Sequence, residues 1–150
     1  MKKQKYKARK GSRFKGKDAQ IIGDALQDLK NGYGCITTEQ VVNHAKLKKS
    51  PIHSYFEWDN TEAAEKYRFQ QAREMMSNIV EVTIIDGEKS EQRSWLSVSK
   101  EVDGKNKKVY VTLKDAVAIP SYRKQLLNKA IITLENLTIT MKMFREQDTQ

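Results

Sequence analysis

Acidic side chains follow a histidine in the middle of the sequence, a combination that could hold a metal ion for phosphate hydrolysis. The group comprises His53, Glu57, Asp59, Glu62 and Glu65. Its acids also have a simpler role, because Asp59 and Glu62 have the spacing of a helix capping box and glutamates favour the first turn of a helix. The sequence contains no phosphate-binding glycine loop, nucleophile elbow or paired metal-ligand motif. We therefore predict that the protein is not an enzyme and needs no metal or cofactor.

Basic and hydroxyl side chains in the same region have the chemistry of a nucleic-acid contact. Lys48, Lys49 and Ser50 can bind phosphate groups through charge and hydrogen bonds. His53 and Ser54 belong to the same short segment and can reach the edges of bases. We predict that these side chains lie on or beside a short helix that faces the major groove of DNA.

The charge of the chain is concentrated at its N-terminus. Residues 1–18 hold nine basic side chains and one acid, a net charge of +8, whereas the whole chain carries +9. The bases are Lys2, Lys3, Lys5, Lys7, Arg9, Lys10, Arg13, Lys15 and Lys17. A segment so rich in like charges buries too little apolar surface to offset the entropy of ordering it, so we predict a disordered basic arm over residues 1–17.

Three interpretations of this arm are open: it binds nucleic acid, it docks on an acidic protein, or it only keeps the chain in solution. We favour nucleic acid, because each phosphate that a lysine or arginine neutralises releases a condensed counterion. A helix lying on a membrane surface is disfavoured, since the segment has no stripe of large apolar residues.

Length and composition limit the class of protein. The chain has 150 residues, of which 38% are hydrophobic and 31% charged, enough for one domain with a small core. No run of eighteen apolar residues is present, so we predict no membrane span. Cys35 is the single cysteine, which excludes an internal disulfide and a cysteine-based zinc site. We expect a reducing cytoplasm as the setting.

Helix signals begin directly after the basic segment. Asp18 is a candidate cap for a first helix that ends near Asn31. Thr37 and Gln40 have the spacing of a capping box and predict the start of a second helix. Ser50 and Pro51 predict a third, short helix, because serine suits the cap and proline the first helical position. Three such helices over residues 18–60 have the spacing of a helix-turn-helix.

This segment resembles the DNA-binding head of tetracycline-repressor-type regulators. The residues that carry the resemblance are Thr37, Val41, Val42, Ala45, Leu47, Ile52 and Phe56. Two positions depart from the family pattern, since Lys46 replaces the usual turn glycine and Pro51 enters the third helix. The resemblance implies a DNA-binding head. It does not extend to the family's ligand-sensing part, which is helical throughout, whereas strands are predicted here further along the chain.

Together with this three-helix head, the remainder of the chain predicts an α+β fold in one domain over residues 18–150. A helix is expected over 61–79 and a small antiparallel β-meander over 80–113. Asp86 with Gly87 and Asp103 with Gly104 have the residue types of hairpin turns. A long C-terminal helix is predicted over 121–146.

The C-terminal helix carries an apolar seam. Its residues recur at alternating steps of three and four and are Leu127, Ala130, Leu134, Leu137, Met141 and Phe144. Two interpretations are open. The favoured one is packing on the domain's own core, because three heptads is the lower limit for a coiled coil. The other is a homo-oligomer formed through Leu127, Leu134, Leu137, Met141 and Phe144.

A second resemblance covers most of the chain. The block from Ser50 to Asp59, with Tyr67, Arg68 and the later Val109 segment, is similar to small phage and prophage proteins of no assigned activity. Our leading hypothesis is a non-catalytic phage-type DNA-binding protein, regulatory or accessory to DNA replication, recombination or packaging, in the host cytoplasm or the virion. Its expected partner is double-stranded DNA. The alternative is an interaction or virion-assembly protein whose arm docks on an acidic partner or packaged genome.

Overall fold

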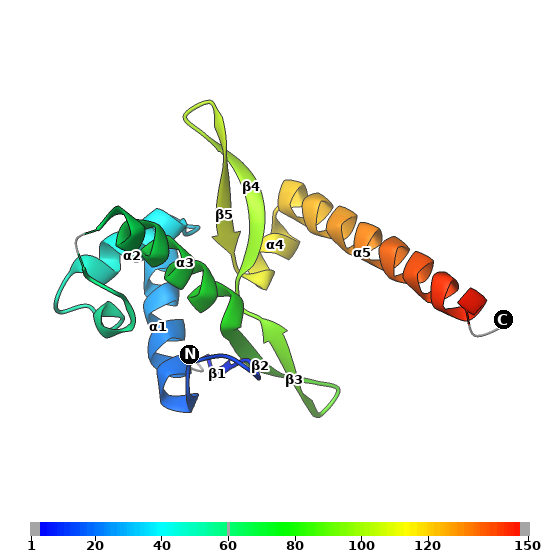
Figure 1. The fold of residues 1–150 in the computed structure, drawn as a ribbon, viewed down its shortest axis with the longest axis horizontal. Helices are drawn as coiled ribbons and strands as arrows, with labels where there is room; N and C mark the ends of the chain where they lie inside the picture. Colours follow the sequence, from blue (N-terminus) through cyan, green and yellow to red (C-terminus); the bar gives the residue numbers. More distant parts are fainter. Residues whose placement is uncertain (1–3, 60, 148–150) are drawn as a thin grey trace. The chain divides into compact units, whose positions relative to one another are not determined.

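The structure, a computed structural model, describes residues 4–59 and 61–147. It contains both helices and antiparallel strands, so the predicted α+β class is confirmed. The chain divides into two compact units, unit 1 (Met1–Leu113) and unit 2 (Lys114–Gln150) (Figure 1). This differs from the single domain that we predicted over residues 18–150.

In its described residues, unit 1 is built from three α-helices, one 3₁₀ turn and two small sheets. Its helices are α1 (Gly16–Tyr33), α2 (Thr38–Lys46) and α3 (Glu62–Asn78). The capping box predicted for the second helix is confirmed, since Thr37 Oγ1 accepts from the Gln40 backbone N–H at 3.2 Å and Gln40 Oε1 accepts from the Thr37 N–H at 2.8 Å. The largest fully buried side chains are Ile22, Leu26, Ile36, Val41, Ile52, Met75, Met76, Ile79, Val98, Val109 and Val111.

The capping box predicted from Asp59 and Glu62 is wrong. The cap of α3 is Thr61, whose side chain accepts from the Ala64 backbone N–H, and the helix begins at Glu62. Asp59 instead offers its backbone carbonyl to Arg68 Nη1 at 3.0 Å.

The short recognition helix that we predicted from Ser50 and Pro51 is also wrong. Only one 3₁₀ turn, η1 (His53–Tyr55), forms there, and the chain leaves it extended at Phe56. The physical reason lies on α3, whose buried Arg68 and Gln71 side chains bind the backbone that follows the turn. Arg68 donates to the Glu57 carbonyl at 3.1 Å, and Gln71 donates to the Tyr55 carbonyl and accepts from the Glu57 N–H. These backbone groups are therefore not available for helical hydrogen bonds.

The N-terminal segment is folded in its described part, contrary to the disordered arm predicted over 1–17. Strand β1 (Tyr6–Ala8) pairs antiparallel with β2 (Ile79–Ile85), with Tyr6 opposite Glu81. Tyr6 and Phe14 are each 5% exposed, so two aromatic anchors offset the entropy that we had judged too large. Lys2 and Lys3 lie outside the described residues.

A close contact with Gly23 holds the Tyr6 ring on α1. A Cβ atom at Gly23 would lie 2.2 Å from two ring carbons of Tyr6, far inside contact distance. We expect Gly23→Ala to lower the free energy of unfolding by about 1–2 kcal/mol, because overpacking outweighs the gain in helix propensity. Chemical denaturation measures this.

Gly32→Ala is the matched control, because Gly32 lies in the same helix and a Cβ there meets nothing within 4 Å. We expect it to raise stability by roughly 0.5–1 kcal/mol. Equal effects at the two glycines would contradict the close packing of Tyr6.

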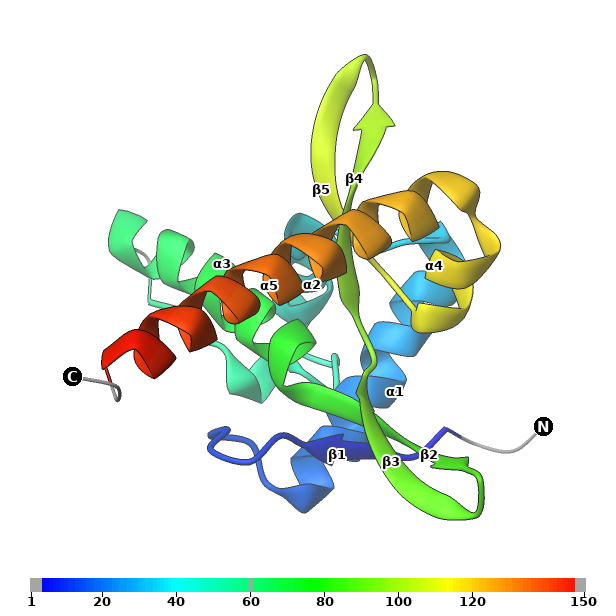
Figure 2. The ribbon, with the colours of Figure 1, turned by 90° about the vertical axis from the view of Figure 1, so that its right-hand side faces the viewer.

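Among the residues that the structure describes, the strands form two sheets and not the single meander predicted over 80–113. One sheet has the order β1-β2-β3, with β3 at Glu88–Arg93, and the other pairs β4 (Leu96–Val102) with β5 (Lys105–Val111) (Figure 2). The break falls at Ser94 and Trp95, which are buried at 4% and 2% exposure.

Both predicted hairpin turns are confirmed. Asp86 with Gly87 and Asp103 with Gly104 have positive φ, as a two-residue type I′ turn requires.

The described residues of unit 2 contain α4 (Leu113–Ala118), apart from its first residue, and the whole of α5 (Pro120–Gln147). The long C-terminal helix predicted over 121–146 is therefore confirmed. The large seam residues Leu127, Leu134, Leu137, Met141 and Phe144 are each at least 55% exposed. Over the described part of the chain, every helix is too short or too polar to cross a bilayer.

Candidate nucleic-acid interface

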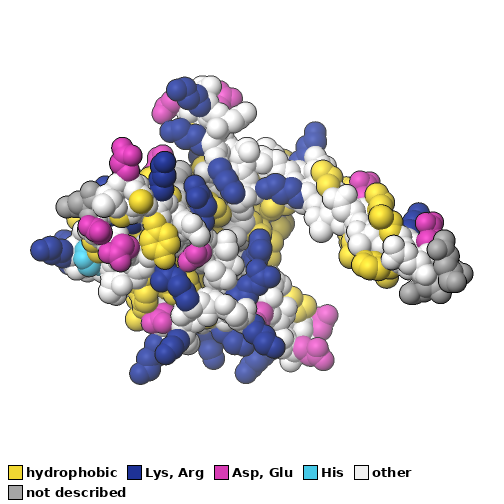
Figure 3. Space-filling view, in the orientation of Figure 1, with side chains coloured by type: hydrophobic (Ala, Val, Ile, Leu, Met, Phe, Trp, Pro, Cys, Tyr) yellow, Lys and Arg dark blue, Asp and Glu magenta, His cyan; other side chains and the backbone are white. Residues whose placement is uncertain are grey.

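The folded N-terminal segment fixes a set of bases on the surface of unit 1. Its described members are Lys5, Lys7, Arg9, Lys10, Arg13, Lys15 and Lys17, and all are exposed. We call this set the N-terminal basic surface. Figure 3 shows Lys and Arg side chains gathered along the lower edge of unit 1, where Figure 1 places β1 and the start of α1.

Local structure turns these side chains outward. Successive residues of a strand point to opposite faces, so burial of Tyr6 places Lys5 and Lys7 on the other face. The Arg9 backbone N–H donates to the Asn78 carbonyl at 2.7 Å, which anchors the chain directly after β1. A turn follows, with a 3.0 Å hydrogen bond from the Ser12 N–H to the Arg9 carbonyl. The segment therefore presents its bases from an ordered backbone.

Two members of the N-terminal basic surface have acidic partners. Lys7 pairs with Glu91 of β3, and Arg13 Nε lies 3.2 Å from Glu74 Oε2 of α3. Within residues 4–59 and 61–147, no ion pair is found for Lys5, Arg9, Lys10, Lys15 or Lys17. Because like charges repel, this surface is suited to a polyanionic partner.

Asp18 stabilises the junction between this surface and α1. Its carboxylate accepts from the Lys15 backbone N–H at 2.9 Å and from the Tyr55 hydroxyl at 2.8 Å. The Lys15 hydrogen bond, and next the Tyr55 hydroxyl, lower the pKa of Asp18. Burial, with the bond to Asp18, raises the pKa of Tyr55 to about 12.

We expect Asp18→Asn to lower stability at pH 7 by about 0.5–1 kcal/mol, a small effect because the carboxylate is solvent-accessible. The folded pKa lies below the unfolded one, so the contribution is present above about pH 4 and is lost as pH falls through the folded pKa. The free energy of unfolding, measured by chemical denaturation at pH values from 7 to 2, should therefore fall less steeply with pH for the variant than for the wild type. The same pH dependence of stability in the wild type and the variant would contradict a stabilising role of the Asp18 carboxylate.

The residues predicted for the recognition helix have separate positions. Lys48, Lys49 and Ser54 are exposed, but they do not share a helix. Ser50 Oγ lies 2.9 Å from His44 Nδ1, and His53 Nδ1 lies 2.7 Å from the Ala45 carbonyl oxygen. The His53 ring also stacks on Trp58 with centroids 5.0 Å apart, so His53 is engaged within unit 1.

Sequence reasoning missed a second group of bases on β4 and β5. Lys100, Lys105, Lys107 and Lys108 are all exposed on this hairpin. The signal was present, because three of the four residues after the Asp103–Gly104 turn are lysines.

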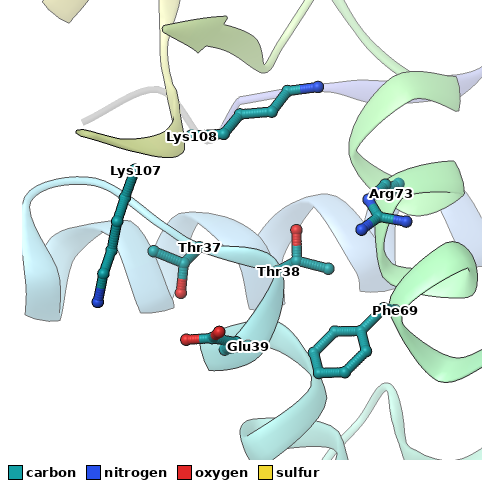
Figure 4. A pocket seen from close by; sticks show the side chains of 7 residues that line it. All are labelled: Thr37, Thr38, Glu39, Phe69, Arg73, Lys107 and Lys108. Atoms are coloured by element: carbon teal, nitrogen blue, oxygen red, sulfur yellow. The ribbon is translucent and has the colours of Figure 1, made fainter. Parts of the chain in front are cut away.

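A cleft of about 340 Å³ lies beside this hairpin (Figure 4). It is lined by Thr37, Thr38, Glu39, Phe69, Arg73, Lys107 and Lys108. In Figure 4, Arg73 extends from α3 toward Thr38 at the start of α2, while Lys107 reaches down from β5 beside Thr37. The cleft brings together bases from α3 and β5 that are distant in sequence.

The acids considered for a metal site are placed at the start of α3 and in the segment before it. Glu62 and Glu65 occupy the first turn of α3, as their type favours. Among the residues that the structure describes, no three His, Cys, Asp or Glu side chains are grouped as metal ligands would be.

Comparisons with models of known protein families, with curated protein sequences and with solved structures gave no significant match.

Proposed function

We propose that unit 1 binds double-stranded DNA without catalysis, through the N-terminal basic surface. The observation that carries this proposal is the exposure of seven bases on a folded segment whose two aromatic side chains are buried. Each phosphate that such a base neutralises releases a counterion, which favours binding whatever the DNA sequence.

Order in the segment strengthens this proposal. A disordered arm loses conformational entropy when it binds, whereas β1 and its turn are already held by β2 and α3. The contacts that this surface can make are to phosphates, which position a protein on DNA but do not read its sequence. We propose an accessory role in DNA replication, recombination or packaging, in keeping with the phage-type resemblance.

The experiment is a titration of the full-length protein into fluorescent duplex DNA near 0.15 M salt, followed by anisotropy. We expect binding at micromolar concentration or tighter, comparable for duplexes of unrelated sequence and weakened by added salt. Absence of binding at 50 mM salt would overturn the proposal, since low salt favours this interaction most.

A second candidate function is self-assembly through α5. Between Leu126 and Phe144, Lys129, Glu135 and Lys142 are the charged residues. The seam residues from Leu127 to Phe144 are exposed, and within its described residues unit 2 contains no further helix or strand besides α4 and α5. A helix with so much apolar surface is usually covered by a partner. We propose a homo-oligomer through the seam, which serves either DNA binding or virion assembly.

A further inference from the structure

The β4–β5 hairpin is a two-stranded ribbon that stands away from the helices of unit 1 in both views (Figures 1 and 2). Its base is fixed, because Ile36 and Tyr110 exchange backbone hydrogen bonds of 3.1 and 2.8 Å and Val98 and Val109 are buried. Its outer half, from Ser99 to Lys108, is exposed apart from the partly buried Val102. A rigid base with an exposed outer half suits an element that enters a groove of a partner.

One face of the ribbon collects lysines. Lys100 lies directly opposite Lys107, and Lys105 lies opposite Val102, so these side chains share a face. The nearest strand acid, Glu101, pairs with Asn106 on the opposite face. Like charges directly opposite one another destabilise a ribbon, so the lysine pair costs stability that an anion between them would restore.

The cleft beside the ribbon extends this charge. Lys107 and Lys108 line it from β5, and Arg73 lines it from α3. Glu39 is the one acid among the lining residues, so bases outnumber acids there. Phosphate oxygens are the complementary partners for lysine and arginine side chains placed in this way.

We propose that the β4–β5 ribbon inserts into the major groove of double-stranded DNA, with Lys100, Lys105 and Lys107 on phosphates along the groove and Arg73 on a phosphate near the cleft. This inference rests on the proposed function and adds a second contact element to it. Seven-residue strands extend for about 23 Å. The major groove is about 12 Å wide and admits a two-stranded ribbon, whereas the minor groove is about half that width.

The test is the full-length variant Lys100→Ala, Lys105→Ala, Lys107→Ala. We expect its affinity for duplex DNA to fall about 10- to 100-fold near 0.15 M salt, and the slope of log K against log salt to become smaller by about 2–3. Without DNA we expect unchanged or higher stability, because the lysine pair is gone. Thermal denaturation of the free protein therefore separates lost contacts from lost folding.

The matched control is Lys46→Ala, Lys66→Ala, Lys89→Ala, which removes the same charge from exposed positions elsewhere on unit 1. We expect less than a threefold loss of affinity. Equal losses in the two triple variants would overturn the ribbon as a specific contact.

Methylation of guanine N7, a major-groove atom, tests the placement. We expect the wild type to protect N7 from methylation. The variant Lys100→Ala, Lys105→Ala, Lys107→Ala should not protect it. Protection confined to minor-groove adenine N3 would overturn the placement in the major groove. If the variant Lys100→Ala, Lys105→Ala, Lys107→Ala binds like the wild type while variants of the N-terminal basic surface lose affinity, the ribbon does not contact DNA and the proposed function stands. If the wild type binds no duplex, the proposed function itself fails.

Discussion

Replacing Lys5, Arg9, Lys10 and Lys17 together with alanine should weaken the binding of duplex DNA on the order of 100-fold near 0.15 M salt. These four side chains are exposed, and none has an ion-pair partner among the described residues. Their charge is therefore available to DNA phosphates, and removing it removes the counterions released on binding. Fluorescence anisotropy with a labelled duplex measures the loss.

The four-alanine variant should keep its fold, because Tyr6 and Phe14, which anchor the segment, are left in place. Deleting residues 1–17 would be a poorer experiment, since it removes β1 from its sheet. Arginine at the three lysine positions is the matched control, because it preserves charge. We expect it to retain wild-type affinity within about threefold, since phosphate contacts depend chiefly on charge. A four-alanine variant that binds as tightly as the wild type would show that the N-terminal basic surface does not bind DNA.

Aspartate at two adjacent seam positions, Leu134→Asp with Leu137→Asp, should convert an oligomer of this protein into a monomer. Both side chains are more than half exposed in unit 2, at 62% and 55%. Placing a carboxylate in an apolar interface without a partner charge costs several kcal/mol. Sedimentation should show at least a twofold fall in mass at equal concentration.

Other features of α5 also favour burial against a partner. The hydroxyls of Thr133, Thr138 and Thr140 donate to backbone carbonyls four residues earlier at 2.8–2.9 Å, so their polar atoms are satisfied within the helix. Asn128→Asp is the control, because it introduces a carboxylate on α5 outside the seam. A wild type that sediments as a monomer at all concentrations would contradict self-assembly through α5.

Features set by neighbouring residues could be predicted from the sequence. The capping box of Thr37 and Gln40, the turn at Asp103 and the length of α5 all follow from side chains within a few residues of each other. These elements depend on hydrogen bonds and dihedral preferences that do not require the rest of the fold.

Features set by distant residues could not be predicted. Order in the N-terminal segment depends on the gap that Gly23 leaves for Tyr6. The short helix predicted from Ser50 and Pro51 does not form because Arg68 and Gln71 of α3 bind the backbone there. The same limit applies to the candidate site. The bases of residues 5–17 were evident as a charge cluster, but their fixed positions and the grouping of Arg73 with Lys107 arise only in the folded chain.

The salt dependence of duplex binding, compared between the wild type and the four-alanine variant, tests the central claim most directly. Each phosphate contact contributes about −0.9 to the slope of log K against log salt, so removing four contacts should make the slope smaller by about 3 to 4. That difference is the result we predict. Equal slopes, or a wild type whose binding does not respond to salt, would show that the N-terminal basic surface does not bind DNA phosphates.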